Sequence, residues 1–476
     1  MAADLATDYT VSDDGLIYTI PIKSGVYYSY QGKIPTDDTR PQYEVQAKDF
    51  VFALQRVFTK ETASPYADTL SAIQNSGACL NGTLPVSALG VKALDAYTLQ
   101  ITLAFPDPEF ITKLCCPGAM PCNQTFFEGT YGSYGLDMEH ILSSGDFRIT
   151  LWDSTDGVTL RRNTTRKGYV ERIRLLLPSL NQDGTPADTP IQRLDNETTD
   201  LEIITGDLTS NSYRQNSFST TTWVLAFNCA NPQLSNANIR LALASVAYRT
   251  PLEKNEHYTF AEGLVPPNVT MLDTSFREYA GSVADIYPQD VTSLLKAGLQ
   301  ELSAQMSQGK ETPVVLEKLS GLKVLVPTDS FVASYFDSIN QMWQKELGAF
   351  FSVSQVSDAE LETAYKSGSY DIILLPLSMQ QNDVYSILTH FATGDKTNYT
   401  RFVSAAFDAE IAEIAATGNM TKRTTLYRQA ERNLLIGAPV VPLFYENSTL
   451  LTVKWLENIV FSPFGPVVDV TNAYKK

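Results

Sequence analysis

The stretch Gln46-Ala-Lys-Asp49-Phe-Val-Phe-Ala-Leu-Gln-Arg56, followed by Thr62-Ala-Ser-Pro-Tyr66-Ala, carries the clearest pattern in the chain. Gln46 and Asp49 have the spacing of a capping box, in which a side chain in the first helical turn accepts a hydrogen bond from the N-cap backbone. Apolar residues recur at helical spacing on one face: Phe50, Leu54, Val57 and Phe58. The stretch therefore predicts a helix that begins after Gln46 and buries this face.

A hairpin is predicted upstream, in Val11-Ser-Asp-Asp-Gly15-Leu-Ile-Tyr-Thr-Ile20-Pro-Ile-Lys-Ser-Gly25. The pair Asp14-Gly15 favours a turn with positive φ. The residues after this turn alternate between apolar and polar, as in a half-buried strand, with Leu16, Tyr18, Ile20 and Ile22 on one face.

Length and charge set limits on the fold and on the partners. A chain of 476 residues is too long for one hydrophobic core and is expected to form two or three domains. Its net charge of −17 argues against nucleic acid as a partner, because neutralising phosphates requires clustered Lys and Arg. No apolar run reaches the length of a membrane span, and the first residues lack the basic and apolar regions of a signal peptide.

Five cysteines stand at Cys79, Cys115, Cys116, Cys122 and Cys229. Adjacent cysteines do not fit the spacing of ordinary zinc sites, so no metal site is predicted. Two alternatives remain open for the first four: a disulfide, as in many extracytoplasmic proteins, or buried free thiols.

The sequence shows no arrangement typical of catalysis. His140, His257 and His390 are far apart and share no ligand or triad spacing. Nucleophile-elbow, metalloprotease and phosphate-loop motifs are also missing from the sequence. We therefore expect a protein that is not an enzyme and needs no cofactor; a hydrolase that uses carboxylates is the alternative from a different class.

Seven ordered segments resemble signature segments of the extracellular solute-binding proteins of family 5, which serve oligopeptide and dipeptide ABC transporters. The opening stretch is similar to the family's T-A-x-D-F-V-F-x-L-x-R … T-A-S-P-Y-A, and the hairpin to its S-x-D-G-x-x-Y-T-F segment. The other five are Leu89-Gly-Val-Lys-Ala-Leu-Asp-Ala-Tyr97-Thr-Leu, Ser235-Asn-Ala-Asn-Ile239-Arg-Leu-Ala-Leu, Gly263-Leu-Val-Pro-Pro267, Arg423-Thr-Thr-Leu-Tyr427-Arg-Gln-Ala-Glu431 and Val440-Val-Pro442-Leu-Phe-Tyr445.

The resemblance implies an α/β fold of the periplasmic-binding-protein type, in the type II cluster that carries an extra domain. Two lobes of mixed sheets with flanking helices would be joined by a hinge. We expect the extra domain and the start of lobe one in residues 1–145, the rest of lobe one in 146–234, lobe two in 235–445 and a return to lobe one in 446–476. Lys323-Val-Leu-Val-Pro327, followed by a helix that ends at Gly348, has the α/β pattern expected for lobe two.

The same resemblance implies a substrate-binding protein that captures short peptides and delivers them to the permease subunits of an ABC transporter. Such a protein is expected to be a monomer in the cell envelope, either periplasmic or held as a lipoprotein on the outer face of the membrane. Compared with the family, this chain lacks the signal and the first strands, so the sheet of lobe one is expected to have an exposed edge. Alternatives within the family are a receptor for a nickel chelate, for haem or for an oligosaccharide.

The predicted ligand site follows from one more family segment, D-x-x-x-x-x-W-x-A-D-Y-x-D-P-x-x-F-L, whose second aspartate binds the amine of the peptide in peptide-binding members. In the matching residues 371–388, Gln380 stands where that aspartate belongs. Asp383 is the alternative acid for the amine, and the pair Asn382-Asp383 fits equally well as the cap of a helix that begins near Tyr385. The predicted substrate-binding set is Gln380, Asn382, Asp383 and Asn398, and the predicted hinge set is Phe227, Asn228, Pro442 and Tyr445.

Overall fold

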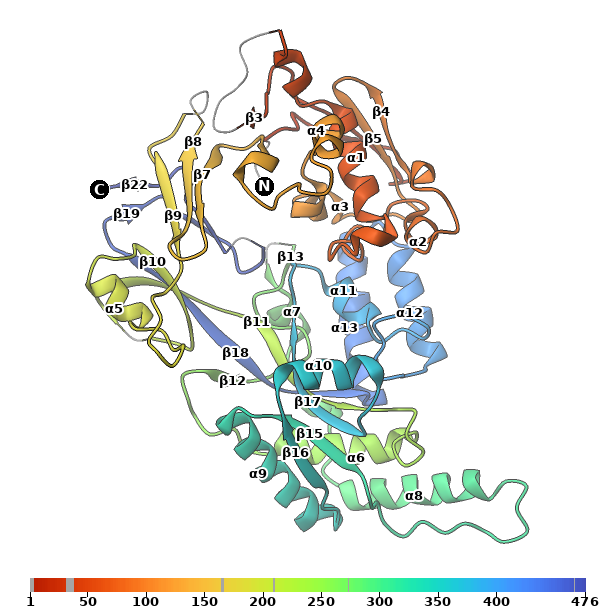
Figure 1. Ribbon diagram of the computed structural model, residues 1–476. Coiled ribbons are helices and arrows are strands. Elements are labelled where there is room, and N and C mark those ends of the chain that lie inside the picture. Colours follow the sequence, from red (N-terminus) through yellow and green to blue (C-terminus); the bar gives the residue numbers. More distant parts are fainter. Residues whose placement is uncertain (1–3, 31–37, 164–166, 209, 273, 466) are drawn as a thin grey trace. The chain divides into compact units, whose positions relative to one another are not determined.

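The computed structural model describes residues 4–30, 38–163, 167–208, 210–272, 274–465 and 467–476 (Figure 1). The chain divides into two compact units: unit 1 comprises Met1–Glu202, Ser212–Arg214 and Thr452–Lys476, and unit 2 comprises Ile203–Asn211 and Gln215–Leu451. Each division falls in or beside one of three strands, β10 (Leu201–Thr205), β11 (Tyr213–Phe227) and β18 (Val440–Val453). The four-part division expected from the sequence stays a prediction.

Helix α1 (Ala47–Val57) confirms the helix predicted after Gln46. The Gln46 N–H donates to the Asp49 carboxylate at 3.0 Å, as the capping box requires. Leu54, Val57 and Phe58 are fully buried. Phe50 is half-buried and packs on the same core, so the predicted apolar face is correct.

The α1 helix belongs to a core in unit 1 built on a four-stranded antiparallel sheet of order β1-β2-β5-β4. The strands are β1 (Thr10–Val11), β2 (Ile17–Pro21), β4 (Val91–Asp95) and β5 (Thr98–Thr102). The hairpin before β2 is confirmed, because Gly15 has a φ of +73° and the side chains of Tyr18, Ile20 and Ile22 are buried.

A second sheet of unit 1 is the antiparallel meander β7 (Phe147–Asp153), β8 (Gly157–Arg162) and β9 (Arg172–Leu176). Gly157 closes its first hairpin with a φ of +104°, and a Cβ there would lie 2.0 Å from the carbonyl oxygen of Leu175. The remaining strands of unit 1 form short pairs: β3 (Ser29–Tyr30) with β6 (Leu142–Ser143), β19 (Leu456–Glu457) with β22 (Tyr474–Lys475), and β20 (Val460–Phe461) with β21 (Val468–Asp469).

Short helices complete unit 1. They are α2 (Ser76–Leu80), α3 (Phe110–Lys113), α4 (Gln124–Gly129) and α5 (Pro190–Asp195). Single 3₁₀ turns lie between them at η1 (Arg40–Tyr43), η2 (Lys60–Thr62), η3 (Val86–Ala88), η4 (Pro117–Ala119) and η5 (Met138–His140).

Unit 2 is built on a mixed seven-stranded sheet of order β10-β18-β11-β17-β15-β16, with β12 (Tyr258–Phe260) also paired to β18. The strands β15 (Lys323–Pro327), β16 (Ser352–Val356) and β17 (Ile372–Ser378) alternate with helices, as predicted for lobe two. Strand β15 runs parallel to both β16 and β17, whereas β11 is antiparallel to β17. Strands β13 (Thr270–Met271) and β14 (Thr274–Ser275) form a separate pair.

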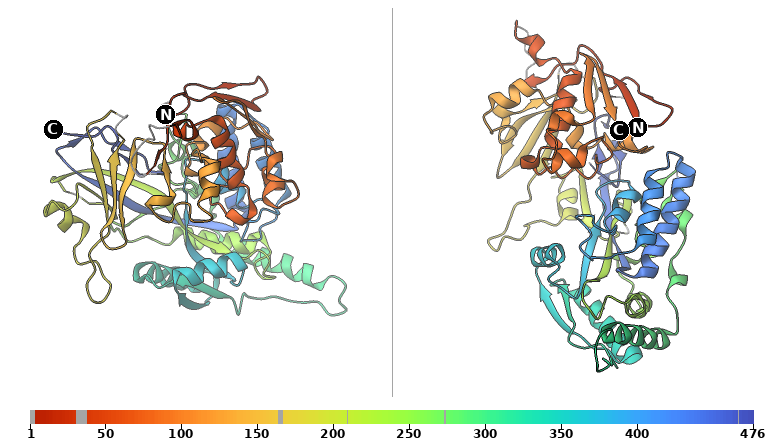
Figure 2. Two further views of the ribbon diagram at one scale, coloured as in Figure 1. Left: turned by 45° about the horizontal axis from the view of Figure 1, so that its top comes forward. Right: turned by 90° about the vertical axis from the view of Figure 1, so that its right-hand side faces the viewer.

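Eight α-helices are described in unit 2, and Figure 2 shows α12 beside α13 and α6 beside α9, as their contacts require. Their bounds are α6 (Ala237–Arg249), α7 (Phe276–Ala280), α8 (Val291–Ser307), α9 (Ser330–Leu347), α10 (Asp358–Ser367), α11 (Val384–Thr389), α12 (Ala405–Ala415) and α13 (Met420–Gly437), with a 3₁₀ turn at η6 (Ala284–Ile286). The predicted stop of α9 is confirmed, because Gly348 has a φ of +65° and its N–H returns to the Gln344 carbonyl. In the described part of the chain, no helix combines the length and the apolar character needed to cross a membrane.

Candidate functional site

The candidate ligand loop, residues 379–383, lies in unit 2 between the end of β17 and the start of α11. Asp383 is the N-cap of α11: its carboxylate accepts the Tyr385 N–H at 2.9 Å, and its carbonyl accepts the Ser386 hydroxyl at 2.8 Å. The side chain is buried, with 4 % of the residue exposed. The capping alternative is therefore confirmed, whereas a role of Asp383 in binding an amine stays a prediction.

Asn382 anchors this loop to the segment around Thr270. Its Oδ1 accepts the Thr270 N–H at 2.8 Å, and its Nδ2 donates to the Thr270 carbonyl at 3.0 Å. The side-chain amide of Asn382 thus makes the same pair of hydrogen bonds to Thr270 that the backbone of a neighbouring strand would make. Gln380, two residues earlier, is exposed.

Asn398 is held by a different part of unit 2. Its Nδ2 donates to the Phe402 and Ala392 carbonyls at 2.8 and 3.0 Å, and its Oδ1 accepts the Thr400 hydroxyl at 2.9 Å. None of its hydrogen bonds reaches residues 379–383. Gln380, Asn382 and Asp383 thus share one loop, whereas Asn398 has the contacts of a loop brace elsewhere in unit 2.

The strand before the loop has one open edge in the described chain. Strand β11 pairs with all of β17, whereas β15 pairs only with Ile372 and Ile373. The Met379 N–H donates to the Thr220 carbonyl, so odd-numbered residues of this strand point their backbone groups at β11 and even-numbered residues point them away. The Leu374 N–H still faces β15 beside the last bridged pair, and past it the backbone groups of Pro376 and Ser378 face the open side.

Pro376 fits this assignment. A proline inside a sheet is tolerated where its missing N–H would face away from the ladder. Pro376 and Ser378 are both exposed, and the Ser378 hydroxyl lies 2.8 Å from that of Thr221 on β11. The open edge therefore offers the carbonyls of Pro376 and Ser378 and the N–H of Ser378 to a ligand.

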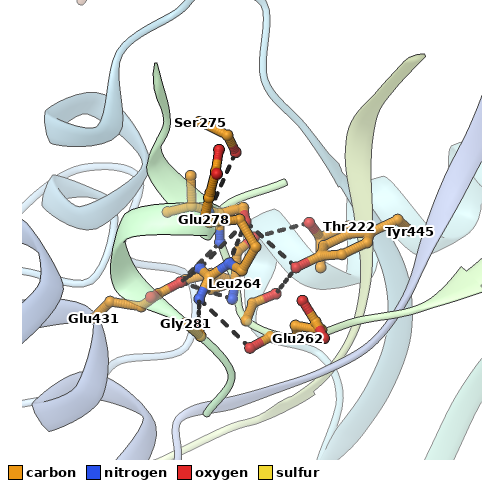
Figure 3. A network of polar contacts seen from close by, with 11 residues as sticks. Thr222, Glu262, Leu264, Ser275, Glu278, Gly281, Glu431 and Tyr445 are labelled. Atoms are coloured by element: carbon orange, nitrogen blue, oxygen red, sulfur yellow. Dashed lines mark hydrogen bonds and ion pairs between the residues drawn. The ribbon is translucent and has the colours of Figure 1, made fainter. Parts of the chain in front are cut away.

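A buried ion pair holds the segment that supports the loop (Figure 3). The Glu431 carboxylate on α13 accepts the Leu264 and Val265 N–H groups at 2.9 and 3.0 Å and pairs with the Arg277 guanidinium of α7. Both side chains of the pair are at most 4 % exposed. Two segments that the sequence analysis singled out separately, residues 263–267 and 423–431, thus meet at one carboxylate.

The electrostatics of this pair favour its charged form. Burial disfavours the charged guanidinium, but the negative groups around it, chiefly Glu431, outweigh this effect and raise the pKa of Arg277. Arg277 also donates to the Gly281 carbonyl at 2.8 Å. A Cβ on Gly263 would lie 2.2 Å from this guanidinium, which explains the glycine at that position.

Two hydroxyl groups complete the support. The Tyr445 hydroxyl of β18 donates to the Gly263 carbonyl at 3.0 Å, and burial raises the pKa of Tyr445, so the donor stays protonated. The Thr222 hydroxyl of β11 donates to the Leu264 carbonyl at 2.8 Å. Further along, Asn268 accepts the Ser219 N–H at 2.7 Å. Residues 263–270 are therefore held by two strands, β11 and β18, and by two helices, α7 and α13, before Thr270 meets Asn382.

The four predicted hinge residues lie inside unit 2. Phe227 ends β11 and is fully buried, and the Asn228 amide donates to the Tyr370 carbonyl at 2.9 Å. Pro442 and Tyr445 are within β18, before the residues at which that strand enters unit 1. Their role as a hinge stays a prediction.

All five cysteines are free thiols, so the alternative without a disulfide describes this structure. Of the first four, Cys79, Cys116 and Cys122 are buried as expected, whereas Cys115 is exposed. Within the described ranges, no cluster of His, Cys, Asp and Glu is arranged to hold a metal ion.

Sequence reasoning missed the residues that brace the loop, namely Thr222, Asn268, Thr270 and Arg277. Thr270 and Asn268 carry no local signal, because their bonds run to residues distant in the sequence. Arg277 could be suspected only as the partner of Glu431, since a buried carboxylate requires a positive or donor group.

Comparison with known proteins agrees with this fold. Residues 1–399 match the family model of bacterial extracellular solute-binding proteins, family 5. The periplasmic oligopeptide-binding protein OppA of Escherichia coli is 24 % identical over 436 residues, which cover 87 % of this chain and 75 % of the relative. The dipeptide-binding protein of Lactococcus lactis is 23 % identical over 500 residues, covering 100 % of this chain and 86 % of the relative.

Two solved structures share the architecture. The substrate-binding domain of an oligopeptide ABC transporter from Bacillus anthracis aligns with a TM-score of 0.71 at 21 % identity, covering 100 % of this chain and 90 % of its own. Listeria monocytogenes OppA bound to peptide aligns with the same score and identity and the same coverage. With a family model that matches most of its length, this chain belongs to the bacterial extracellular solute-binding proteins of family 5.

Proposed function

We propose that this chain is the substrate-binding protein of a peptide ABC transporter and that it binds short peptides in extended form at the open edge of β17. The observation that carries the proposal is the stretch of residues 376–378, which pairs with β11 on one side, whereas on the other side the pairing with β15 ends at Ile373. The outward backbone groups of this stretch can bond a peptide as a neighbouring strand would. Backbone bonding gives affinity with little dependence on the side chains of the peptide, which suits a transporter of mixed peptides.

The relatives support this function. Several are named as oligopeptide- or dipeptide-binding proteins, and one related structure holds a peptide. The family consists of solute-binding proteins, and we extend this to propose that the chain releases its ligand unchanged. We also propose that it works outside the cytoplasm as a monomer and delivers its ligand to the permease subunits of the transporter.

The site departs from the family segment at the position that binds an amine. Gln380 is exposed and neutral there, and Asp383 is buried as a helix cap. If Asp383 also serves the ammonium group of the peptide, Asp383→Asn lowers affinity for free peptides by about 2–5 kcal/mol and leaves N-acetylated peptides unaffected. Because Asn caps a helix about as well as Asp, the substitution keeps the cap, and if Asp383 acts only as a cap, neither kind of peptide should bind more weakly.

The edge can be tested with two substitutions at one residue. Ser378→Pro removes the N–H on the open side, whereas the bonds of β17 to β11 come from odd-numbered residues and are kept. We expect the variant to lose at least one hydrogen bond to the peptide. Its binding free energy should weaken by about 0.5–1.5 kcal/mol, or roughly 2- to 12-fold in Kd, as measured by calorimetry with a peptide that stabilises the wild type. Ser378→Ala keeps the N–H and should bind as the wild type does. If both variants bind as the wild type does, the peptide does not use this edge.

The class of ligand is tested by thermal stabilisation with peptides, oligosaccharides, nickel chelates and haem. A ligand that binds only the folded chain raises its melting temperature, by a free energy of about 2.7 kcal/mol at 100 times its Kd. We expect peptides alone to do so, and mass spectrometry should recover them intact. Stabilisation by another class, or cleavage with turnover, would contradict the proposal.

A further inference from the structure

The meander β7-β8-β9 of unit 1, labelled in Figure 1, carries different side chains on its two faces. Its registers place residues that pair across the strands on the same face. One face is mainly apolar: it carries Phe147, Ile149, Trp152, Val158, Leu160, Ile173 and Leu175, with the buried Arg162 at its end. The other carries the arginines Arg148, Arg161, Arg172 and Arg174, together with Leu151, Thr159 and Leu176. Its one carboxylate, Asp153, lies at the β7–β8 turn and accepts the Thr155 and Asp156 N–H groups.

Three of these arginines form a row straight across the sheet. Arg148 is paired with Arg161, and Arg161 with Arg172, so like charges stand directly opposite one another on adjacent strands. Strands are about 5 Å apart, and like charges at directly opposed positions destabilise a sheet. Arg174 lies on the same face, two residues beyond Arg172. The fold thus keeps an arrangement that costs stability.

The row is open to solvent and is not neutralised. Arg161, Arg172 and Arg174 are exposed, and within the described ranges none of them forms an ion pair. Arg148 is half-buried and donates to the Arg162 carbonyl at 3.0 Å. The neighbouring Arg162 behaves differently: it belongs to the opposite face, is buried, and pairs with Asp146 at 3.5 Å.

The charge of this region opposes that of the chain. Residues 147–176 contain seven Arg and Lys residues against three Asp and Glu residues, in a chain whose net charge is −17. At physiological salt, charges more than about 8–10 Å away are largely screened, so the sheet presents a locally positive surface. An anionic partner could therefore contact this face without meeting the acidic remainder of the chain.

We propose that this arginine face docks on a membrane surface that contains anionic phospholipids. Guanidinium groups bind phosphate oxygens through two parallel hydrogen bonds, and a flat row of several of them suits a surface of repeated phosphates better than it suits one small anion. Leu151, 47 % exposed, stands on the same face beside the arginines and supplies the apolar contact common at membrane interfaces. The docking would orient unit 1 toward the bilayer. It does not depend on the peptide site.

Flotation with lipid vesicles tests the proposal. The untagged full chain should float with vesicles of phosphatidylcholine and phosphatidylglycerol at low salt, and neither with phosphatidylcholine alone nor at high salt. The variant Arg161→Gln/Arg172→Gln/Arg174→Gln should lose about a hundredfold in partition coefficient, since each basic residue near an anionic surface contributes roughly fivefold. The matched control Lys60→Gln/Lys310→Gln/Lys318→Gln makes the same charge change at exposed lysines elsewhere and should float as the wild type does.

Several outcomes would overturn the lipid assignment. Failure of the wild type to float with anionic vesicles is one such outcome, and flotation of both triple variants to the extent of the wild type is another. A third contrary result concerns soluble polyglutamate. If the wild type binds polyglutamate but no vesicles, and the arginine variant binds neither, the partner is an acidic polypeptide. Melting temperatures equal to or above that of the wild type would show that the arginine variant is folded.

Discussion

Arginine is used in opposite ways in two regions of the molecule, around Glu431 in unit 2 and on the arginine face of the meander in unit 1. In unit 2, Arg277 is 4 % exposed, pairs with Glu431 and donates to backbone carbonyls, so that one guanidinium fixes a whole segment. In unit 1, Arg161, Arg172 and Arg174 are exposed on a sheet where neighbouring like charges repel one another. Removing the first kind of arginine contact should damage the fold, whereas removing the second kind should not.

The difference shows how to separate structural charge from charge available for function. A buried charge is kept only where its partners compensate for lost hydration, and it is then part of the fold. An exposed row of like charges gives the fold no stability that smaller polar residues would not also give. Its explanation has to be sought in a partner.

The largest expected effect is that of Glu431→Gln. It leaves the buried Arg277 without its negative partner and should lower the free energy of unfolding by about 3–5 kcal/mol in urea denaturation. The control Glu413→Gln removes an exposed ion pair with Lys422, whose side chains are 52 and 54 % exposed, and should change stability by about 0–1 kcal/mol. Equal losses of stability in the two variants would contradict the distinction between the buried ion pair and the exposed one.

A smaller effect is expected for Gly263→Ala. The new Cβ would lie 2.2 Å from the Arg277 guanidinium and should displace it, at a cost of about 1–3 kcal/mol. Gly77→Ala, at an exposed helical position with no atom within 4 Å, serves as the control and should be neutral or slightly stabilising. A neutral Gly263→Ala would mean that the guanidinium is not confined there.

The smallest change in stability is expected for a substitution in the exposed row of arginines. Arg161 stands between Arg148 and Arg172, and Arg161→Gln relieves both repulsions. The melting temperature should rise slightly, corresponding to a few tenths of a kcal/mol, and the gain should shrink at high salt because salt screens the charges. A clear loss of stability would show that the row supports the fold.

The sequence predicted local features well. The capping box before α1, the turn at Gly15 and the stop of α9 at Gly348 were correct, because each depends on residues that are neighbours along the chain. Strand limits were not predicted in this way: β11 runs over 15 residues, Tyr213–Phe227, and β18 over 14, Val440–Val453. Strand limits depend on pairing with distant partners, which a local pattern does not contain.

The site was predicted only in part. The family segment led to Gln380, Asn382 and Asp383, and it allowed both roles of Asp383, of which the structure shows the cap. The contact of Asn382 with Thr270 links residues 112 positions apart and has no trace in either local sequence. The opposite characters of the two faces of the β7-β8-β9 meander likewise emerge only once the registers of its three strands are known.

The central claim is that a peptide adds to the open edge of β17. Hydrogen exchange of the backbone amides, measured with and without a stabilising peptide, tests it most directly. We predict that the peptide slows exchange at Ser378 much more than at Leu375 and Leu377, whose N–H groups already face β11. A peptide that stabilises the chain yet leaves the exchange of Ser378 unchanged would contradict the claim.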